Sequence, residues 1–224
     1  MGGGRVKFIL MSTDLTTSNF SPTEGQFPAP AYPVYRFSIA EYLQMADSGL
    51  LAHADVELLD GIVVPKITRN SWHDATLGRV HLLLVTALLS KPWQARNQSA
   101  MVTNRGVPEP DIALVRGTHD DYLVQRPTSR DTGLVIEISD STLKLDRQKA
   151  EIYADAGVPQ YWIISAVDQC VEIYDQLQRD AAGQMVYGAK RIIRGSETVQ
   201  LSLDGTLMAT FAADQLVPPL PVQR

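Results

Sequence analysis

The order of apolar and polar residues along the chain predicts a mixed domain that begins with a helix and a hairpin. A helical period covers residues 37–48, where Ser38 and Glu41 have the spacing of a capping box. Two short apolar runs follow within residues 56–64, joined by Asp60-Gly61. An Asp-Gly pair between apolar runs favours a type I′ turn, because both of its central residues need positive φ.

The later patterns alternate between strand and helix. In chain order they are a helix over 72–90, strands near 100–103 and 112–115, a polar loop over 117–131, a strand over 134–138, a helix over 146–156, strands over 161–165 and 171–174, and further short strands over 184–211. This order predicts an α/β (mixed α+β) fold in which helices flank a central mixed sheet.

The length and the two ends of the chain predict one domain with tails. The chain has 224 residues, which corresponds to one ordinary globular domain. Residues 1–33 combine glycines, a Ser/Thr run and prolines without periodicity, which is typical of a flexible tail. We expect a single domain over 34–215 and a Pro-rich tail over 216–224.

Charge narrows the classes of function. The formal net charge is -5, and the sequence contains no block of Lys and Arg. Proteins that bind nucleic acid without specificity are usually basic, so this composition argues against tight, metal-free DNA binding. It does not exclude a nuclease, because a cation bound to catalytic carboxylates reverses the local charge.

The cysteine and histidine content predicts a reducing environment. Cys170 is the single cysteine, so no internal disulfide can form, and the four histidines show no metal-binding spacing such as CxxC or HExxH. No apolar segment reaches the roughly 18 residues of a membrane span. We therefore expect a cytoplasmic protein without a structural zinc site or a membrane anchor.

The strand over 134–138 carries a carboxylate among apolar residues. Glu137 lies within Leu-Val-Ile-Glu-Ile, a run typical of a strand covered on both faces. A buried carboxylate needs a partner or a metal, because an unpaired buried charge costs several kcal/mol or shifts its pKa. Glu137 is thus a candidate site residue; alternatively it lies at a sheet edge or pairs with an arginine.

The next helix carries one charge within its apolar stripe. Leu145, Lys149, Ile152, Tyr153 and Ala156 share one face at helical spacing. A strand, a short loop and a helix bring Glu137 and Lys149 to the same end of the sheet. The alternative is a lysine whose stem packs while its ammonium reaches water.

A second carboxylate stands at the start of an apolar strand. Asp111 follows Pro110 and precedes Ile-Ala-Leu-Val, and the proline forces an extended backbone before it. Asp111 is a candidate partner for Glu137; alternatively it caps a turn.

Taken together, these residues resemble the PD-(D/E)XK nuclease pattern and, more closely, the Uma-type restriction endonuclease family. The fragments that carry the resemblance are, in chain order, Glu57-Leu58-Leu59-Asp60-Gly61, His73, Gln98, Pro108-Glu109-Pro110-Asp111, Val135-Ile136-Glu137-Ile138-Ser139, Asp146-Arg147-Gln148-Lys149, Tyr153-Ala154 and Gly157-Val158-Pro159-Gln160-Tyr161-Trp162. The resemblance covers about residues 36–175. In one respect the chain departs from the superfamily pattern, because Ser139 stands two residues after Glu137 where a lysine is common.

The resemblance implies a restriction-endonuclease-like core and a catalytic set of Asp111, Glu137 and Lys149, the lysine coming from the following helix. Asp111 and Glu137, with the backbone carbonyl of Ile138, are the expected ligands of Mg²⁺ or Mn²⁺, which prefer oxygen.

Three further residues are assigned provisional roles. Glu57 is a candidate additional carboxylate of the catalytic set. His73 is expected to contact phosphate or water; alternatively, it has only a structural role at the start of its helix. Gln98 is expected to orient water or substrate; alternatively, it is a solvated loop residue.

The leading hypothesis is a metal-dependent endonuclease that cleaves DNA. The alternatives are a binding or regulatory module that retains the nuclease fold with little or no turnover, and a metal hydrolase acting on another phosphate ester. A homodimer is plausible on symmetry grounds, because a two-fold pair suits cleavage of both strands of a duplex.

Overall fold

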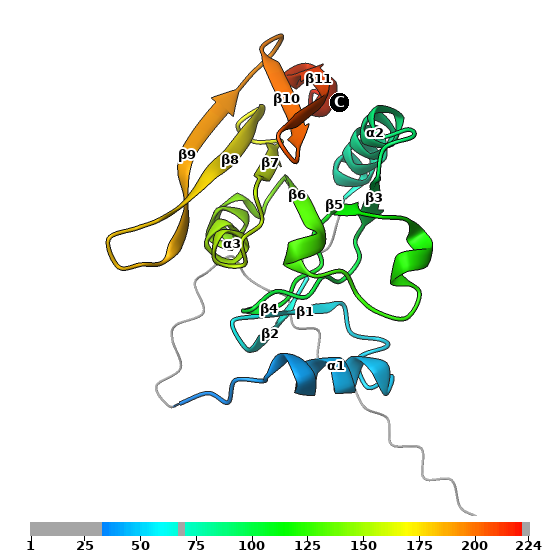
Figure 1. The fold of residues 1–224 in the computed structure, drawn as a ribbon, viewed down its shortest axis with the longest axis vertical. Helices are drawn as coiled ribbons and strands as arrows, with labels where there is room; N and C mark the ends of the chain where they lie inside the picture. Colours follow the sequence, from blue (N-terminus) through cyan, green and yellow to red (C-terminus); the bar gives the residue numbers. More distant parts are fainter. Residues whose placement is uncertain (1–32, 67–69, 221–224) are drawn as a thin grey trace, which may run out of the picture. The chain divides into compact units, whose positions relative to one another are not determined.

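The fold is built on a six-stranded mixed sheet. The computed structural model describes residues 33–66 and 70–220. The strands are β3 (Trp93–Asn97), β5 (Ile112–Arg116), β6 (Thr132–Ser139), β7 (Tyr161–Ser165), β8 (Cys170–Arg179) and β9 (Met185–Ile193), and they lie side by side in this order (Figure 1). β6 and β7 are parallel, and the other neighbours are antiparallel, which confirms the predicted mixed sheet.

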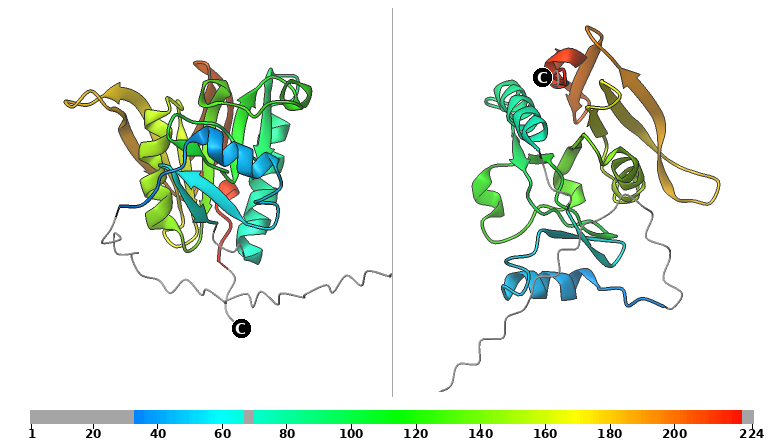
Figure 2. Two further views of the ribbon diagram at one scale, coloured as in Figure 1. Left: turned by 90° about the horizontal axis from the view of Figure 1, so that it is seen from below. Right: turned by 180° about the vertical axis from the view of Figure 1, so that it is seen from behind.

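One face of the sheet packs against α2 (Ser71–Ala87), the hairpin of β10 (Thr198–Leu203) and β11 (Thr206–Ala212), and the short helix α4 (Ala213–Leu216). Their buried apolar side chains form one core with the side chains of β6 and β7 that point to this face, among them Ile136 and Trp162. Figure 2 shows α2 and the β10–β11 hairpin beside the sheet.

The other face of the sheet packs against α3 (Leu143–Asp155). Tyr153 of α3 shares a buried cluster with Val135 of β6 and with Tyr161 and Ile163 of β7. Side chains alternate between faces along a strand, so Glu137 lies on the same face as Val135 and points towards α3. Every residue of β6 is buried, as expected for a strand that is covered on both faces.

A small sheet and one helix complete the domain. β1 (Val56–Leu59) pairs with β2 (Ile62–Pro65) and with β4 (Gly106–Val107), and α1 (Ile39–Asp47) packs against them through Tyr42. The predicted capping box at the start of α1 is confirmed, and Asp60 and Gly61 both have positive φ, at 50° and 77°. Gly106 is required by a close approach, because a Cβ there would lie 2.1 Å from the Leu58 carbonyl oxygen.

The predicted strand near residues 100–103 is wrong. Within that segment the only pairing is an isolated bridge from Val102 to Thr128, whereas the strand lies earlier, at Trp93–Asn97. β3 is an edge strand with a polar sequence, so it lacks the apolar run that signals a buried strand. Residues 100–103 contain the wholly buried Met101, which gives a strand-like pattern to a segment that belongs to no ladder.

Several predicted boundaries moved by a few residues. α2 ends at Ala87 rather than at Ser90, α3 begins at Leu143 rather than at Asp146, and the polar loop over 117–131 contains two short 3-10 helices, η1 (His119–Tyr122) and η2 (Ser129–Asp131). Leu216 and Val217 are buried in the core although the C-terminal tail was predicted to begin at 216. The predicted tail residues 1–32 and 221–224 lie outside the described residues. Among the described residues, no helix is long and apolar enough to cross a membrane.

A buried carboxylate on β8 links α3 to strands β8 and β9. The side chain of Glu172 on β8 is fully buried and accepts hydrogen bonds from Nε of Arg147 in α3 at 3.1 Å and from Oη of Tyr174 at 2.8 Å. Nζ of Lys190 on β9 forms an ion pair with it at 2.8 Å. Burial acts to raise the pKa of Glu172, but these donors outweigh burial and lower it to about 2.

This contact predicts a defined dependence of stability on pH. The pKa of Glu172 in the folded chain lies below the ordinary value of 4.5, so its contribution is fully present above about pH 4.5 and is lost as the pH falls towards about 2. Glu172→Gln should lower the free energy of unfolding at neutral pH by about 1–3 kcal/mol, because a charged acceptor is replaced by a neutral one. Urea unfolding at a series of pH values measures the difference, which should shrink below about pH 4.5. A difference that stays constant to the acid limit would contradict this account. Glu151→Gln, at an exposed site on α3, is the control.

Candidate functional site

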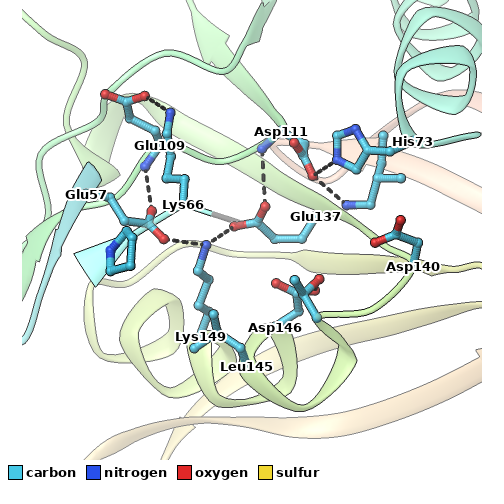
Figure 3. A pocket seen from close by; sticks show the side chains of 13 residues that line it. Glu57, Lys66, His73, Glu109, Asp111, Glu137, Asp140, Leu145, Asp146 and Lys149 are labelled. Atoms are coloured by element: carbon cyan, nitrogen blue, oxygen red, sulfur yellow. Dashed lines mark hydrogen bonds and ion pairs between the residues drawn. The ribbon is translucent and has the colours of Figure 1, made fainter. Parts of the chain in front are cut away.

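A pocket rich in carboxylates lies where β1, β5, β6, α2 and α3 meet (Figure 3). β5 and β6 are antiparallel, with Ile112 opposite Ile136. The start of β5 therefore lies beside the end of β6, which brings Asp111 next to Glu137 and Ile138. The structure places Glu57, His73, Asp111, Glu137, Ile138 and Lys149, all predicted from the sequence, in the lining of this one pocket.

Lys149 is a buried cation between two carboxylates. Its side chain is 8% exposed, and Nζ lies 2.9 Å from Oε1 of Glu57 and 3.1 Å from Oε1 of Glu137. Burial acts to lower the pKa of Lys149, but the charges of Glu137 and Glu57 outweigh it and raise the pKa above its usual value. The alternative in which the ammonium reaches solvent is thus excluded by the structure. The side chain carries a fixed positive charge rather than acting as a proton acceptor.

Glu137 is held by three donors. Oε1 accepts hydrogen bonds from Nζ of Lys149 and from Oη of Tyr153, both at 3.1 Å, while Oε2 accepts the backbone N–H of Asp111 at 3.2 Å. β6 is the third of six strands, so Glu137 is not at a sheet edge, and its cationic partner is a lysine rather than an arginine.

Asp111 is fixed by α2 and β6. Its Oδ2 accepts the backbone N–H of Ile138 at 2.8 Å and lies 3.0 Å from Nε2 of His73. Burial acts to raise the pKa of Asp111, but the contacts with His73, Ile138 and Gln98 outweigh it and lower the pKa. The group is therefore a carboxylate, and Nε2 of His73 is its donor. Gln98 contacts it more distantly, with Nε2 3.5 Å from Oδ1.

His73 lines the pocket and contacts Asp111, whereas Gln98 is linked to the pocket through Asp111. His73 lies in the first turn of α2 and is buried, and its backbone N–H is capped by the Asn70 side chain. Gln98 contacts Asp111 but is not part of the pocket lining. Of Ile138, the structure shows the N–H bonded to Asp111, and the role of its carbonyl as a ligand stays a prediction.

Glu57 links the small sheet to the site. Its Oε2 accepts the backbone N–H of Glu109 at 3.0 Å, while Oε1 contacts Lys149. The side chain of Glu109 in turn pairs with Lys66, which follows β2 directly. Glu57 therefore holds the segment before Asp111 in place as well as neutralising Lys149.

Two groups at the site were missed by the sequence prediction. Asp146 is buried and lines the pocket from α3, with its carboxylate accepting a hydrogen bond from Thr142. It precedes Lys149 by three residues, so the helical period already placed both on one face. Tyr153 offers a weaker signal, because an aromatic residue in an apolar stripe is read as core until its hydroxyl is seen to reach Glu137.

The charges of the pocket fit a bound cation. Six carboxylates line it against two lysines, and one of these, Lys66, is already paired with Asp55 and Glu109. Burial and neighbouring carboxylates raise the pKa of Glu137, against the effect of Lys149, and burial raises the pKa of Asp146. Neighbouring carboxylates add to the effect of burial in both groups, so a bound cation would favour their ionised forms. The ligand atoms are all oxygens, which suits Mg²⁺ or Mn²⁺ rather than a thiolate-binding metal.

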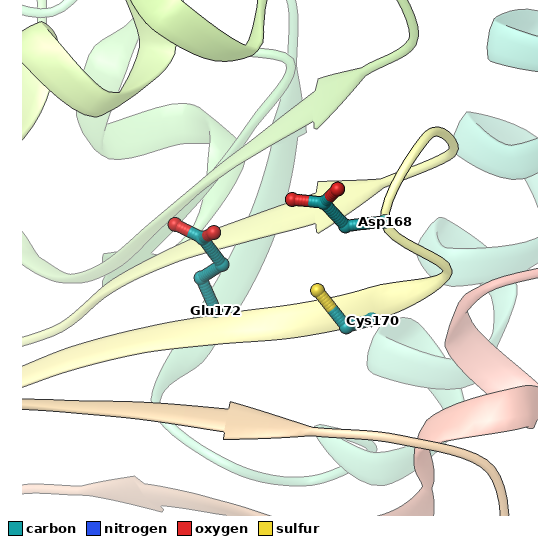
Figure 4. A group of neighbouring side chains, drawn as sticks. All are labelled: Asp168, Cys170 and Glu172. Atoms are coloured by element: carbon teal, nitrogen blue, oxygen red, sulfur yellow. The ribbon is translucent and has the colours of Figure 1, made fainter.

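A second group of potential ligands lies on another part of the sheet. Asp168, Cys170 and Glu172 have ligand atoms within 4.8 Å of one another (Figure 4). Arg147 already bonds both carboxylates, and Lys190 pairs with Glu172. The positive charge that a cation would bring is supplied by the chain itself, so we assign no metal to this group.

Comparisons with known proteins agree with the fold. The family described as "Uma2: Putative restriction endonuclease" matches residues 39–208. Among solved structures, the chain is similar to a protein described as a putative nuclease belonging to DUF820 from Anabaena variabilis ATCC 29413, with a TM-score of 0.61 and 13% identity over 82% of this chain and 97% of the other. No curated protein matches the chain.

The burial of Lys149 between two carboxylates predicts a large effect on stability. Lys149→Met keeps the packing of the side-chain stem but leaves Glu57 and Glu137 buried without a cation. We expect the free energy of unfolding at neutral pH to fall by about 3–5 kcal/mol, measured by urea unfolding. Lys144→Met, at an exposed position on the same helix, should change it by less than about 0.5 kcal/mol. A Lys149→Met variant as stable as the wild type would show that the ion pairs of Lys149 with Glu57 and Glu137 contribute nothing to stability.

Proposed function

Because the chain belongs, over residues 39–208, to the Uma2 family described as "Putative restriction endonuclease", we propose that it is an endonuclease that hydrolyses DNA phosphodiester bonds with the aid of Mg²⁺ or Mn²⁺. The nuclease assignment is supported by the family and by a fold shared with a protein described as a nuclease. The metal, the DNA substrate and the residue roles below are parts of the proposal.

The observation that carries the proposal is the convergence of Asp111, Glu137 and Lys149 in one acidic pocket. Asp111 and Glu137 would hold the cation, which when bound supplies positive charge to the phosphate and lowers the pKa of water. The ion pairs with Glu57 and Glu137 hold the ammonium group of Lys149 in place. Its charge is therefore preorganised, and the reaction requires no rearrangement of it. In that position it orients the attacking water or neutralises the charge that develops on the phosphate.

The remaining predicted residues act on these three. His73 donates to Asp111, and Gln98 lies behind it; both therefore fix the direction of the Asp111 carboxylate. Glu57 has the same relation to Lys149. Asp146 joins the proposed set because its carboxylate lines the pocket beside Lys149.

A second candidate is a binding or regulatory module that keeps the nuclease fold and turns over slowly or not at all. The observation that favours it is the net charge of -5, which is unusual for a protein that must hold a polyanion. We further propose a single domain that includes Leu216 and Val217, a cytoplasmic setting and a two-fold dimer.

Metal binding tests the first step of the proposal. Mn²⁺ should bind the wild type weakly, and Asp111→Asn combined with Glu137→Gln should weaken binding by about tenfold or more, because two carboxylate ligands are removed. Isothermal titration calorimetry measures the affinity. Asp168→Asn, in the group already paired with Arg147, is the control and should bind Mn²⁺ as the wild type does. Equal affinity in the double variant would rule out this metal site.

Cleavage tests the function itself. Single-stranded, duplex and branched DNA are incubated with the protein and with Mg²⁺ or Mn²⁺. Asp111→Asn should lower the cleavage rate by at least roughly 100-fold, as should Lys149→Met at temperatures where circular dichroism shows it folded, because each removes a group that acts on the transition state. Glu151→Ala, exposed on α3, should cleave at the wild-type rate. A wild-type protein that binds Mn²⁺ but cleaves none of these DNAs would favour the binding module.

A further inference from the structure

Helix α2 carries large apolar side chains on its outer side as well as on its inner side. Its inner face is buried, with Val80 and Leu84 in the main core. Its outer face exposes Leu82 and Val85, at 67% and 39% of their surface, and Leu89, just beyond the helix end, at 67%. Figure 1 shows α2 along one side of the sheet, with no other labelled element over its outer side. Exposed Asp74 and Arg79 flank these apolar residues, so the outer side is an apolar strip with charged margins rather than a fully polar face.

A glycine lies on the same outer face. Gly78 is exposed in the middle of α2, and a Cβ added there would meet no atom within 4 Å. Nothing within the described chain requires a glycine at this position, although glycine costs about 1 kcal/mol relative to alanine inside a helix. A glycine does, however, allow another helix backbone to approach closely.

The outer positions follow a seven-residue repeat. The residues that share this face within α2 are Ser71, Ala75, Gly78, Leu82 and Val85, and Leu89 follows in the turn after the helix. Their spacing alternates between four and three residues, which is the seam of two helices packed side by side. The first three are small and the last three are large, so two such helices would approach most closely near their N-termini.

Charges beside the seam define the orientation of a partner helix. Asp74 is exposed on one flank of the seam and Arg79 on the other, five residues further along. In two parallel helices, residues with this spacing on opposite flanks lie next to each other across the seam. Asp74 of each copy would then pair with Arg79 of the other. In an antiparallel pair, the same flanks of the two helices meet. Arg79 of one copy would then face Arg79 of the other, which is repulsive.

We propose that the outer face of α2 binds the same face of a second copy of this chain, with the two helices parallel about a two-fold axis. The occupant is assigned as a second copy because Asp74 and Arg79 on the flanks of this one face complement each other.

The expected interface is modest in size. A helix of 17 residues is about 25 Å long, so a pair of such helices buries less than the roughly 1,200–2,000 Å² of a standard interface. A hollow of about 450 Å³ continues the apolar surface from Val85 and Leu89 to Trp93 on the edge strand β3. We therefore expect a reversible dimer with a dissociation constant in the micromolar range.

Parallel pairing has a consequence for the site. His73 lies in the first turn of α2 and contacts Asp111, so both pockets would lie at the same end of the paired helices. This arrangement suits two cuts in one duplex, but the interface does not depend on the proposed nuclease function.

The first experiment measures the mass of the full chain by sedimentation equilibrium between about 1 and 100 µM, the range set by the expected affinity. The wild type should shift from monomer to dimer, and Leu82→Glu should weaken dimerisation by at least roughly 100-fold, because it places a carboxylate in the apolar seam of both copies. Leu207→Glu, at a similarly exposed leucine on β11, should dimerise as the wild type does. A wild type that stays monomeric, or a Leu82→Glu variant that still dimerises, overturns the proposal.

The glycine provides a test in which the two readouts move in opposite directions. Gly78→Gln should raise the thermal stability of the monomer, because glutamine is a better helix former and meets no atom in the chain. It should lower dimer affinity by at least about tenfold, because the backbones can no longer approach. Unchanged dimer affinity would overturn the role assigned to this face.

The charges test the orientation. Asp74→Arg and Arg79→Asp should each weaken the homodimer by about tenfold, because two attractive contacts become repulsive. A mixture of the two variants should form a heterodimer, since opposite charges then face each other. The parallel arrangement is overturned if either single variant dimerises like the wild type, or if the mixture forms no heterodimer.

Discussion

One buried ammonium group holds the site together. Lys149 of α3 contacts Glu57 of the small sheet and Glu137 of the central sheet, so a single charge joins three parts of the fold. Without Lys149, burial of the ionised Glu57 and Glu137 side chains would be strongly unfavourable, because an isolated buried charge costs several kcal/mol. The other contacts of the pocket follow from this one, because Glu137 in turn fixes the backbone of Asp111, and Glu57 fixes that of Glu109.

The lysine does not balance the charge of the pocket. Four further carboxylates line the same space, among them Asp111 and the buried Asp146. Burial raises the pKa values of Glu137 and Asp146, and the neighbouring carboxylates add to this effect, which is consistent with the cation proposed for this pocket. The contrast with Glu172 supports this view, because that buried carboxylate is fully neutralised by Arg147 and Lys190 and has a lowered pKa.

Helix α2 connects the site with the proposed interface. Its inner face supplies His73 to Asp111 and apolar side chains to the core, while its outer face carries the seam with Gly78 and Leu82. A helix that only covers a core usually keeps a polar outer face, whereas this one exposes Leu82 and Val85 there. The same rigid element thus positions a residue of the pocket and presents the surface proposed for a second copy.

The sequence by itself determined the local features. The capping box of α1, the Asp60-Gly61 turn and the placement of Lys149 in an apolar stripe all depend on residues within one turn or one helical repeat, where spacing and backbone preference decide the outcome. The fold class and the buried strand around Glu137 followed from the same periodicities, and the family resemblance supplied the grouping of Asp111, Glu137 and Lys149.

Only the tertiary structure decided which groups share one space. The antiparallel pairing of β5 with β6 places Asp111 beside Glu137, and the alternation along β6 turns Glu137 towards α3. The polar edge strand β3 was missed, because a strand with one free edge needs no apolar run. The role of Tyr153 was hidden for a similar reason: its ring packs like any core residue, and only the fold shows that its hydroxyl ends on Glu137. Such contacts join residues far apart in the chain, so they depend on strand order and register, which local periodicity does not encode.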